Sequence, residues 1–327
     1  MTPYPKIELH VHLEGSVLPQ TLLDIAKRND HVLPATTVEG LQELYRFTDF
    51  ADFIRVWFLT TNALQKEQDY RQMVVDYAAE AAGHGAVYLE AIFSPSEHVR
   101  RGCRWEDVFD GACNGAQEAR ELHGVEIRFT PDITRGFTLE EARETVEWSA
   151  RYQDRGVVGV GLGGPEAEYP PELYEEVFVY AKSLGLASVP HAGEVAGAAS
   201  VRGALETLHA DRIRHGIRVL EDPSLVDEVV ARDIVLDVCP TSNVRTNLVA
   251  SLAEHPLPRL VDAGITCSVS TDDPAMFDID LASECEVAVA MGLEPRDLFD
   301  AGIAGALCDA ETKQWLRGIK ETYDWDR

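Results

Sequence analysis

Eight short segments rich in Val, Ile and other strand-forming residues recur along the chain, and amphipathic stretches separate them. The strand segments are 7–12, 86–94, 126–133, 157–164, 187–194, 212–217, 234–240 and 266–274. Helical patterns that end at glycine or a polar turn cover 68–83, 105–124, 138–156, 171–185, 200–212, 222–233 and 257–264. This alternation predicts an α/β protein with a parallel sheet. Eight units favour a closed (β/α)8 TIM-type barrel over an open doubly wound sheet.

The length of the chain is compatible with a single barrel. At 327 residues it is long for one ordinary domain, but α/β barrels reach this size as one unit, and no linker or low-complexity run divides it. We therefore expect residues 1–327 to form one domain. The connection 13–85 is too long for a simple helical return, and we expect a helical insertion that lies over the barrel mouth as a lid.

The chain is strongly acidic, with 56 Asp and Glu against 29 Lys and Arg and a formal net charge of −27. That balance argues against nucleic acid and anionic membrane surfaces as partners. The six cysteines form no C-x-x-C pair and the N-terminus lacks an apolar signal core, so we expect reduced thiols and a cytoplasmic location. Homo-oligomerisation remains open.

The first strand carries two histidines one residue apart. Glu8, His10 and His12 alternate with apolar residues, so we expect these three side chains to share one side of the strand. Two neutral imidazoles that reach the same point suit a metal ion. Two histidines on a solvated strand edge would give the same pattern. The residues at the ends of the other strands are therefore needed to distinguish a metal site from a solvated edge.

Polar residues also follow four later strands. The carboxyl ends of the strands carry His10, His12, Gly164, Glu166, His191, Glu194, His215, Asp272 and Asp273. Barrel enzymes collect their chemistry at this rim, and three imidazoles with one aspartate suit zinc with an open position for water. Each residue alone could be structural, but the joint pattern predicts a catalytic metal site. We assign no role to the histidines in helices or connections, which are His31, His84, His98, His123, His209 and His255.

Five motifs in a fixed order resemble those of one family. The motifs are KIELHVHLEGS, VPHAGE, RIRHG, VCPTSN and STDDPAMF, and they span nearly the whole chain. The sequence thereby resembles the adenosine deaminase family, within the amidohydrolase group of zinc barrels. The resemblance implies one zinc ion per chain, held by His10, His12, His191 and Asp272. Two-metal relatives in that group bridge their metals with a modified lysine after strand four, and GLGGPE at 161–166 has none.

The resemblance also implies a reaction and the residues that carry it. The reaction is hydrolytic deamination of the 6-amino group of an adenosine-type purine nucleoside, with release of ammonia. By motif, Glu194 would shuttle the proton, while His215 and Asp273 would orient the attacking hydroxide, with Asp273 also near the purine N7. On the substrate side the implied residues are Gly164 as backbone donor to N3, Glu14 near the ribose, and Phe53, Ile54 and Trp57 as a hydrophobic gate.

Three departures from the family pattern concern the substrate. Glu14 stands where adenosine-specific relatives have an aspartate that meets the 5′-hydroxyl, GGPE replaces A-G-D-E at 163–166, and Arg214 replaces the glycine of R-I-G-H-G. We therefore favour 6-amino-6-deoxyfutalosine, an adenosine-like intermediate of menaquinone synthesis with a 5′ extension. The alternatives are adenosine, adenine and another zinc amidohydrolase reaction. Retention of the metal-type residues and Glu194 disfavours a barrel without catalysis.

Overall fold

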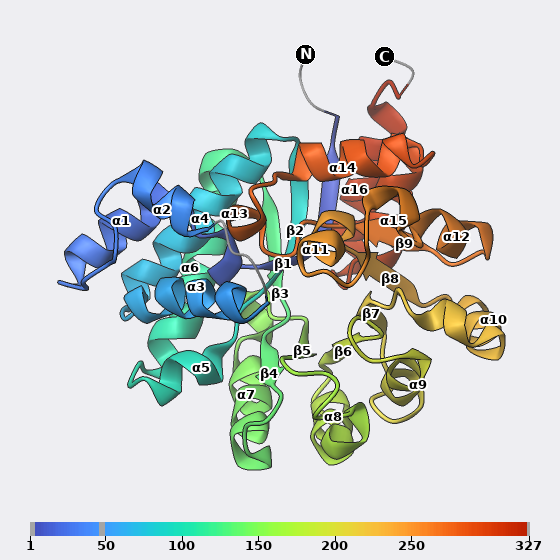
Figure 1. Cartoon of the computed structure of the whole chain (residues 1–327), viewed down its shortest axis with the longest axis horizontal. Helices are drawn as coiled ribbons and strands as arrows, with labels where there is room; N and C mark the ends of the chain where they lie inside the picture. Colours follow the sequence, from blue (N-terminus) through green and yellow to red (C-terminus); the bar gives the residue numbers. More distant parts are fainter. Residues whose placement is uncertain (1–3, 46–49, 326–327) are drawn as a thin grey trace.

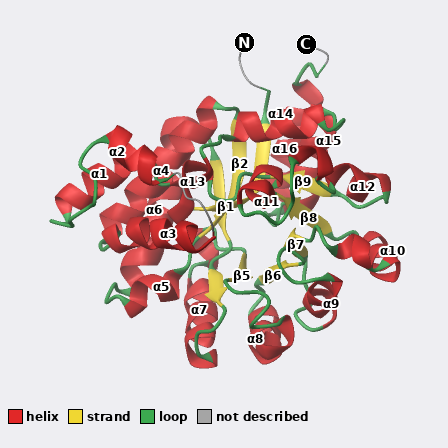
Figure 2. Ribbon diagram, in the orientation of Figure 1, coloured by secondary structure: helices red, strands yellow, loops and turns green. Residues whose placement is uncertain are grey.

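The structure is a computed structural model that describes residues 4–45 and 50–325, and their side chains except those of 50–53. Strands occupy the centre and helices form a ring around them (Figures 1 and 2). The strands are β1 (Lys6–His12), β2 (Ala86–Ile92), β3 (Glu126–Phe129), β4 (Asp132–Thr134), β5 (Gly159–Gly163), β6 (Ala187–Ala192), β7 (Arg212–His215), β8 (Val235–Val238) and β9 (Cys267–Val269).

All neighbouring strands pair in parallel, in the orders β1-β2-β3 and β4 through β9. β3 and β4 are two parts of one barrel strand, because Phe129 bridges Val157 just before β5 while β4 pairs with β5 itself. A parallel bridge between Val11 and Asp272 joins the first strand to the last and closes the barrel. The predicted (β/α)8 architecture is confirmed.

Helices follow the strands as the periodic patterns predict. They are α4 (Glu67–Gly83), α5 (Pro95–Arg100), α6 (Trp105–His123), α7 (Leu139–Arg151), α8 (Glu175–Ser183), α9 (Ala198–Glu206), α10 (Pro223–Ala231), α11 (Pro240–Arg245), α12 (Leu257–Asp262), α13 (Pro274–Phe277), α14 (Leu281–Ala290), α15 (Pro295–Gly305) and α16 (Ala310–Thr322). Short 3-10 turns are η1 (Glu14–Ser16), η2 (Gln153–Arg155), η3 (Pro171–Tyr174), η4 (Val219–Glu221) and η5 (Leu252–Glu254). Most of the apolar core lies between the strands and this helical layer.

The long connection after β1 contains α1 (Pro19–Arg28), α2 (Val38–Leu44) and α3 (Phe50–Ala63) before α4. α3 packs against η1 and α13, which follow β1 and β9 respectively (Figure 1). This end of the barrel is the one that bears the polar rim. The insertion therefore starts where the candidate site lies, while its closure on a substrate stays a prediction.

Buried arginines fill part of the barrel interior. Arg212 of β7 bonds to Glu90 of β2 at 2.7 Å and to Asp237 of β8 at 2.6 Å. Arg214, two residues on, pairs with Asp132 of β4 and donates to Thr130 Oγ1 at 2.6 Å. Because β2 and β4 are not neighbours of β7, these side chains cross the interior. A buried ion pair of this kind is tolerated only when its polar atoms find partners.

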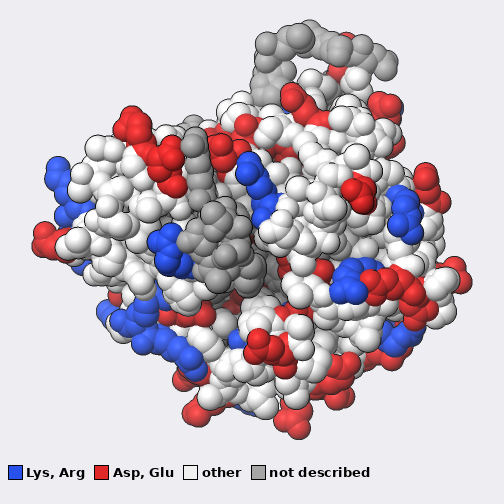
Figure 3. All heavy atoms as spheres, viewed as in Figure 1, with Lys and Arg blue, Asp and Glu red and all other residues white. Residues whose placement is uncertain are grey.

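The surface matches the acidic composition. On the face seen in Figure 3, Asp and Glu side chains are scattered among basic and uncharged ones, and they form no single patch among the residues drawn in colour. All six cysteines are free thiols, and four of them are buried. Across residues 4–45 and 50–325, no helix is both long and apolar enough to cross a membrane.

Candidate metal centre and active site

A bulge lies in the middle of β1, around Leu9 and His10. Ser270 Oγ accepts hydrogen bonds from both Leu9 N at 3.1 Å and His10 N at 3.2 Å, and the pairing with β2 shifts register between Glu8 and Val11. The strict alternation predicted for this strand is therefore wrong between Glu8 and Val11. The Glu8 carboxylate does not join the histidines, because it accepts hydrogen bonds from Tyr77 of α4 and from Thr271.

Four side chains from three strands converge at the rim. His12 Nε2 lies 3.2 Å from His191 Nε2, at the end of β6. Asp272 Oδ1 lies 3.4 Å from both His10 Nε2 and His12 Nε2. The nitrogens of the three histidines can all approach one point. The structure thus brings together all four residues that the sequence assigns to the metal.

The donor atoms of this cluster fit a zinc ion. The Nδ1 atoms of His10 and His191 face the carbonyl oxygens of Asp237 at 3.4 Å and of Leu162 at 3.2 Å, which leaves each Nε2 lone pair free. His10 Nε2 is buried and has no hydrogen-bond partner. Burial lowers the pKa of His10 to about 3 and that of His191 well below its usual value, so both imidazoles are neutral, the form in which histidine can bind a metal.

Asp272 adopts an unusual backbone conformation. Its φ is 68°, in the left-handed region, and its backbone pairs with β1 through His12 N at 2.7 Å. Ser242 Oγ donates to its other carboxylate oxygen, Oδ2, at 2.6 Å. Burial opposes ionisation, but the neighbouring histidines outweigh it and hold the pKa of Asp272 well below its usual value. Asp272 therefore presents one ionised oxygen, Oδ1, to the histidines.

Asp273, the next residue, behaves in the opposite way. Burial and the charge of Asp272 raise the pKa of its carboxyl, so Asp273 favours the protonated form. Its Oδ1 is buried without a hydrogen-bond partner. Gly15 allows this placement, because a Cβ at that position would lie 1.8 Å from Asp273 Oδ1. The glycine after Glu14 is thus a requirement of close packing.

Glu194 and His215 lie beside the metal-type cluster. His215, the last residue of β7, has a φ of 60°, and its Nε2 lies 3.7 Å from Glu194 Oε1 and 3.8 Å from Asp272 Oδ2. The Glu194 side chain is 20% exposed, so it can meet a ligand. Burial of the rest raises the pKa of its carboxyl. The two predicted catalytic groups are therefore neighbours.

Glu166 holds the loop that carries Glu194. Its two oxygens accept hydrogen bonds from four successive backbone amides, those of 193–196, at 2.5, 3.2, 2.7 and 2.9 Å. The sequence placed Glu166 at the rim without a role. A carboxylate that accepts hydrogen bonds from four amides fixes the orientation of that loop. The sequence signal that could have indicated this role is the position of Glu166 directly after the fourth barrel strand.

Arg214 is oriented away from the substrate side. Its buried guanidinium bonds to Asp132 and Thr130 inside the barrel, and Asp132 Oδ2 lies 3.6 Å from His191 Nδ1. Gly161 leaves room for it, because a Cβ there would lie 2.2 Å from Arg214 Nη1. The Arg214 side chain therefore lies inside the barrel and is linked to His191 through Asp132.

Glu14 is held by residues that the sequence left without a role. Its Oε1 accepts hydrogen bonds from Ser94 N at 2.8 Å and His98 Nε2 at 3.1 Å. Arg101 donates to His98 Nδ1 at 2.9 Å and so directs the imidazole proton toward Glu14. Burial opposes ionisation, but these bonds lower the pKa of Glu14. Its second oxygen, Oε2, is buried and unpartnered.

The remaining substrate-side residues are only partly described. Ile54 and Trp57 of α3 are half-buried and pack against the main apolar core. The Phe53 side chain lies outside the described residues. Gly164 has a φ of 101°, which side-chain-bearing residues rarely adopt. Their roles as gate and purine contact stay predictions.

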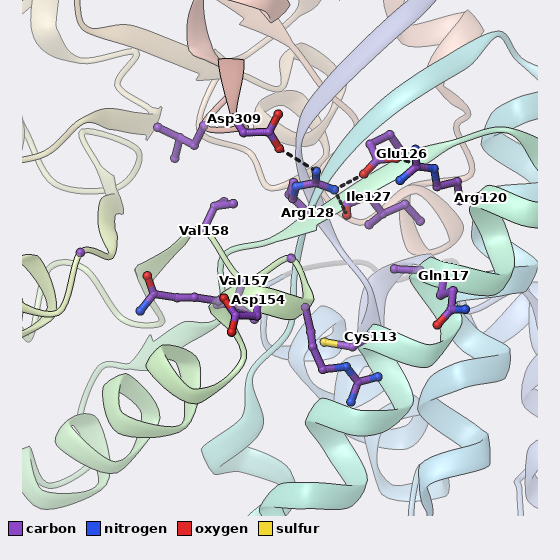
Figure 4. A pocket seen from close by; sticks show the side chains of 16 residues that line it. Cys113, Gln117, Arg120, Glu126, Ile127, Arg128, Asp154, Val157, Val158 and Asp309 are labelled. Carbon is purple, nitrogen blue, oxygen red and sulfur yellow. Dashed lines mark hydrogen bonds and ion pairs between the residues drawn. The ribbon is translucent and has the colours of Figure 1, made fainter. Parts of the chain in front are cut away.

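A hollow opens at the end of the barrel opposite the polar rim, beside β3 and the start of β5 (Figure 4). Its volume is about 610 Å³. Arg128 projects into it and pairs with Glu126 and Asp309, and Arg120 pairs with Glu126 at 3.1 Å. These arginines are neutralised by neighbouring acids, so we assign the hollow no ligand.

The family match places the chain among the hydrolytic deaminases that act on the amino group of a purine. The chain belongs to the adenosine deaminase family, whose model matches residues 5–322. This family is typically metal-dependent. The resemblance stated from the motifs is confirmed.

Two individual proteins of this family are similar to the chain over most of its length. The chain is 55% identical to an aminodeoxyfutalosine deaminase from Acidothermus cellulolyticus, over 98% of this chain and 92% of that protein. It is 39% identical to an adenine deaminase from Streptomyces coelicolor, over 85% and 81%.

Solved structures of related proteins have the same fold. Adenine deaminase from Arthrobacter aurescens superposes with a TM-score of 0.90 at 33% identity, and the match covers 97% of this chain and 98% of that one. A zinc-bound amidohydrolase from Burkholderia ambifaria superposes with a TM-score of 0.88 at 26% identity, over 99% and 91%.

Proposed function

We propose that this chain is a zinc-dependent deaminase of a 6-aminopurine nucleoside with an extended 5′ substituent, specifically 6-amino-6-deoxyfutalosine. The observation that carries the chemistry is the convergence of His10, His12, His191 and Asp272 beside Glu194. The substrate assignment is supported by the 55% identity to the aminodeoxyfutalosine deaminase from Acidothermus cellulolyticus.

His10, His12, His191 and Asp272 would hold one zinc ion, since their free Nε2 lone pairs and one ionised oxygen match its ligand preference. A zinc-bound structural relative supports the choice of metal. When bound, zinc supplies a nucleophile by lowering the pKa of its water toward neutrality. The protein groups behind the ligands, Ser242, Asp132 and the Asp237 carbonyl, set the ligand orientation.

Glu194 is the proposed proton shuttle. Burial raises the pKa of its carboxyl and so favours the protonated form, which can donate to the purine N1 and make C6 electrophilic. His215 Nε2, between Glu194 and Asp272, would stabilise the negative charge on the oxygen that attacks C6. Asp273, kept protonated, donates to N7, and the amide of Gly164 meets N3.

Glu14 is the proposed determinant of substrate choice. Of the other departures from the adenosine-specific pattern, Arg214 is occupied by Asp132 within the barrel, and Pro165 has no polar side-chain atom. Glu14 alone keeps a buried, ionised oxygen without a donor. A hydroxyl group of the substrate satisfies that oxygen, and the longer glutamate leaves a different distance to the ribose than an aspartate would.

A substrate panel tests the assignment. We expect the highest kcat/KM for 6-amino-6-deoxyfutalosine among that compound, 5′-methylthioadenosine, adenosine and adenine. The highest value for adenine would instead favour the second candidate, adenine deaminase, which the 39% identity to the Streptomyces coelicolor protein supports. The highest value for adenosine would refute the role given to Glu14.

Two variants test the residue roles. Glu194→Gln is expected to lower kcat at least 10²-fold while zinc content by elemental analysis stays at one per chain. Glu14→Asp is expected to lower kcat/KM for the futalosine compound more than for adenosine. A second zinc per chain, or unchanged turnover in Glu194→Gln, would refute the corresponding assignment.

A further inference from the structure

A line of hydrogen bonds runs from His215 away from the metal cluster into the protein. Asn243 lies in α11, the helix that follows β8, and His255 follows η5. His215, Asn243 and His255 are all buried. Both later residues lie outside the groups assigned to catalysis above, and His255 was given no role from the sequence. Their hydrogen bonds nevertheless determine which nitrogen of His215 carries its proton.

The backbone amide of Leu257 provides the fixed end of this line. Its N–H lies 3.1 Å from His255 Nδ1, and an amide N–H can only donate. His255 Nδ1 must therefore be the acceptor. Burial lowers the pKa of His255 to about 4, so the ring is neutral near pH 7 and carries its single proton on Nε2.

The orientation of the Asn243 amide follows from His255. The protonated Nε2 of His255 lies 3.1 Å from Asn243 Oδ1, which accepts. The amide nitrogen of Asn243, Nδ2, then faces His215 Nδ1 at 3.2 Å. A carboxamide nitrogen can only donate, so His215 Nδ1 is an acceptor as well. The His215 proton is consequently on Nε2, the atom nearest to Glu194 and Asp272.

We propose that His255 and Asn243 are positioning residues that hold His215 as the Nε2–H tautomer and direct this proton toward the reacting centre. The proposal rests on the proposed function for the role of His215, but the tautomer itself is a property of the folded protein. In the other tautomer a bare Nε2 would face the Glu194 and Asp272 carboxylates, and the ring could not donate a hydrogen bond to the oxygen that attacks C6.

Asn243→Asp is the sharpest test, because it keeps the shape of the side chain and replaces the donor by an acceptor. Histidine labelled with ¹⁵N, in the zinc-loaded protein, reports protonation of each ring nitrogen. We expect protonated Nε2 and unprotonated Nδ1 at His215 in the natural protein, and protonated Nδ1 in Asn243→Asp. We also expect kcat to fall at least 10²-fold with zinc content unchanged. Asn247→Asp, at an exposed position after the same helix, is the matched control and should leave both readouts unchanged.

Variants of His255 separate positioning from packing. The side-chain amide of His255→Gln can still donate to Asn243 Oδ1, so we expect the natural His215 tautomer and at most a few-fold loss in kcat. His255→Leu removes the donor, and we expect both His215 tautomers in the spectrum. We also expect kcat to change by a larger factor than KM. An unprotonated Nδ1 in Asn243→Asp, or a protonated Nδ1 in the natural protein, would overturn the proposal. If the tautomers are as expected but the protein deaminates none of the purines in the panel, the positioning proposal stands and the proposed function is refuted.

Discussion

Replacement of Glu166 by glutamine should loosen the loop that carries Glu194. In the structure, one carboxylate oxygen accepts from the amides of Glu194, Val195 and Ala196, and the other accepts from Gly193. Glutamine has only one accepting oxygen. If that oxygen meets the group of three amides, the NH₂ group of glutamine faces the Gly193 N–H, and that buried donor is left without a partner.

The magnitude follows from these four bonds. A hydrogen bond to a charged acceptor contributes about 1.5–3 kcal/mol and a neutral one about 0.5–1.5 kcal/mol, and an unsatisfied buried donor costs about 1–3 kcal/mol. Because bonds within one network are not additive, we take roughly 4 kcal/mol as the upper bound for Glu166→Gln. Applied to local opening of residues 193–196, this corresponds to an increase of up to about 10³-fold in the open population.

Three measurements check this prediction. Hydrogen exchange should accelerate at residues 193–196, kcat should fall about 10²-fold as Glu194 loses its position, and zinc should stay bound. Glu168→Gln, an exposed residue in the same connection, is the matched control and should change none of the three. Exchange and kcat at the natural level in Glu166→Gln would refute the role given to this carboxylate.

Three further predictions concern other parts of the site. Arg214→Gly, which restores the family's glycine, should destabilise folding by about 3–5 kcal/mol because Asp132 is left as an uncompensated buried charge, and an unchanged melting temperature would contradict it. Ser242→Ala should weaken zinc binding about 10–100-fold in a chelator competition, because Asp272 loses its 2.6 Å hydrogen bond, whereas equal affinity would exclude that role. The folded-state pKa of His255, about 4, lies below the unfolded value of 6.5, so between pH 4 and pH 6.5 the folded state binds fewer protons than the unfolded state. The contribution of neutral His255 to the free energy of unfolding is therefore complete above pH 6.5, and about 3 kcal/mol of it is lost as the pH falls to 4 and below. His255→Gln should therefore flatten the pH dependence of urea unfolding in that window.

The sequence and the structure agree where the physics is local. Strand and helix periodicities act over a few residues, so the barrel could be predicted from them, as could a shared rim for His10, His12, His191 and Asp272. The register of β1 could not, because the bulge at Leu9 and His10 depends on Ser270, which lies 260 residues away from His10 in the chain. For that reason the expected place of Glu8 beside the histidines was wrong.

The sequence by itself determined the fold class and the chemical type of the site, since parallel strands must end at a common edge and their last residues are read directly from the chain. Only the tertiary structure decided how those residues are supported. Arg214 fills space left by Gly161, Glu166 binds the loop of Glu194, His98 holds Glu14, and His255 acts on His215 through Asn243. Each of these contacts joins segments from different strands or loops, and their meeting depends on how the closed barrel brings those segments together. Because these partners are far apart in the chain, no local sequence pattern predicts that they meet.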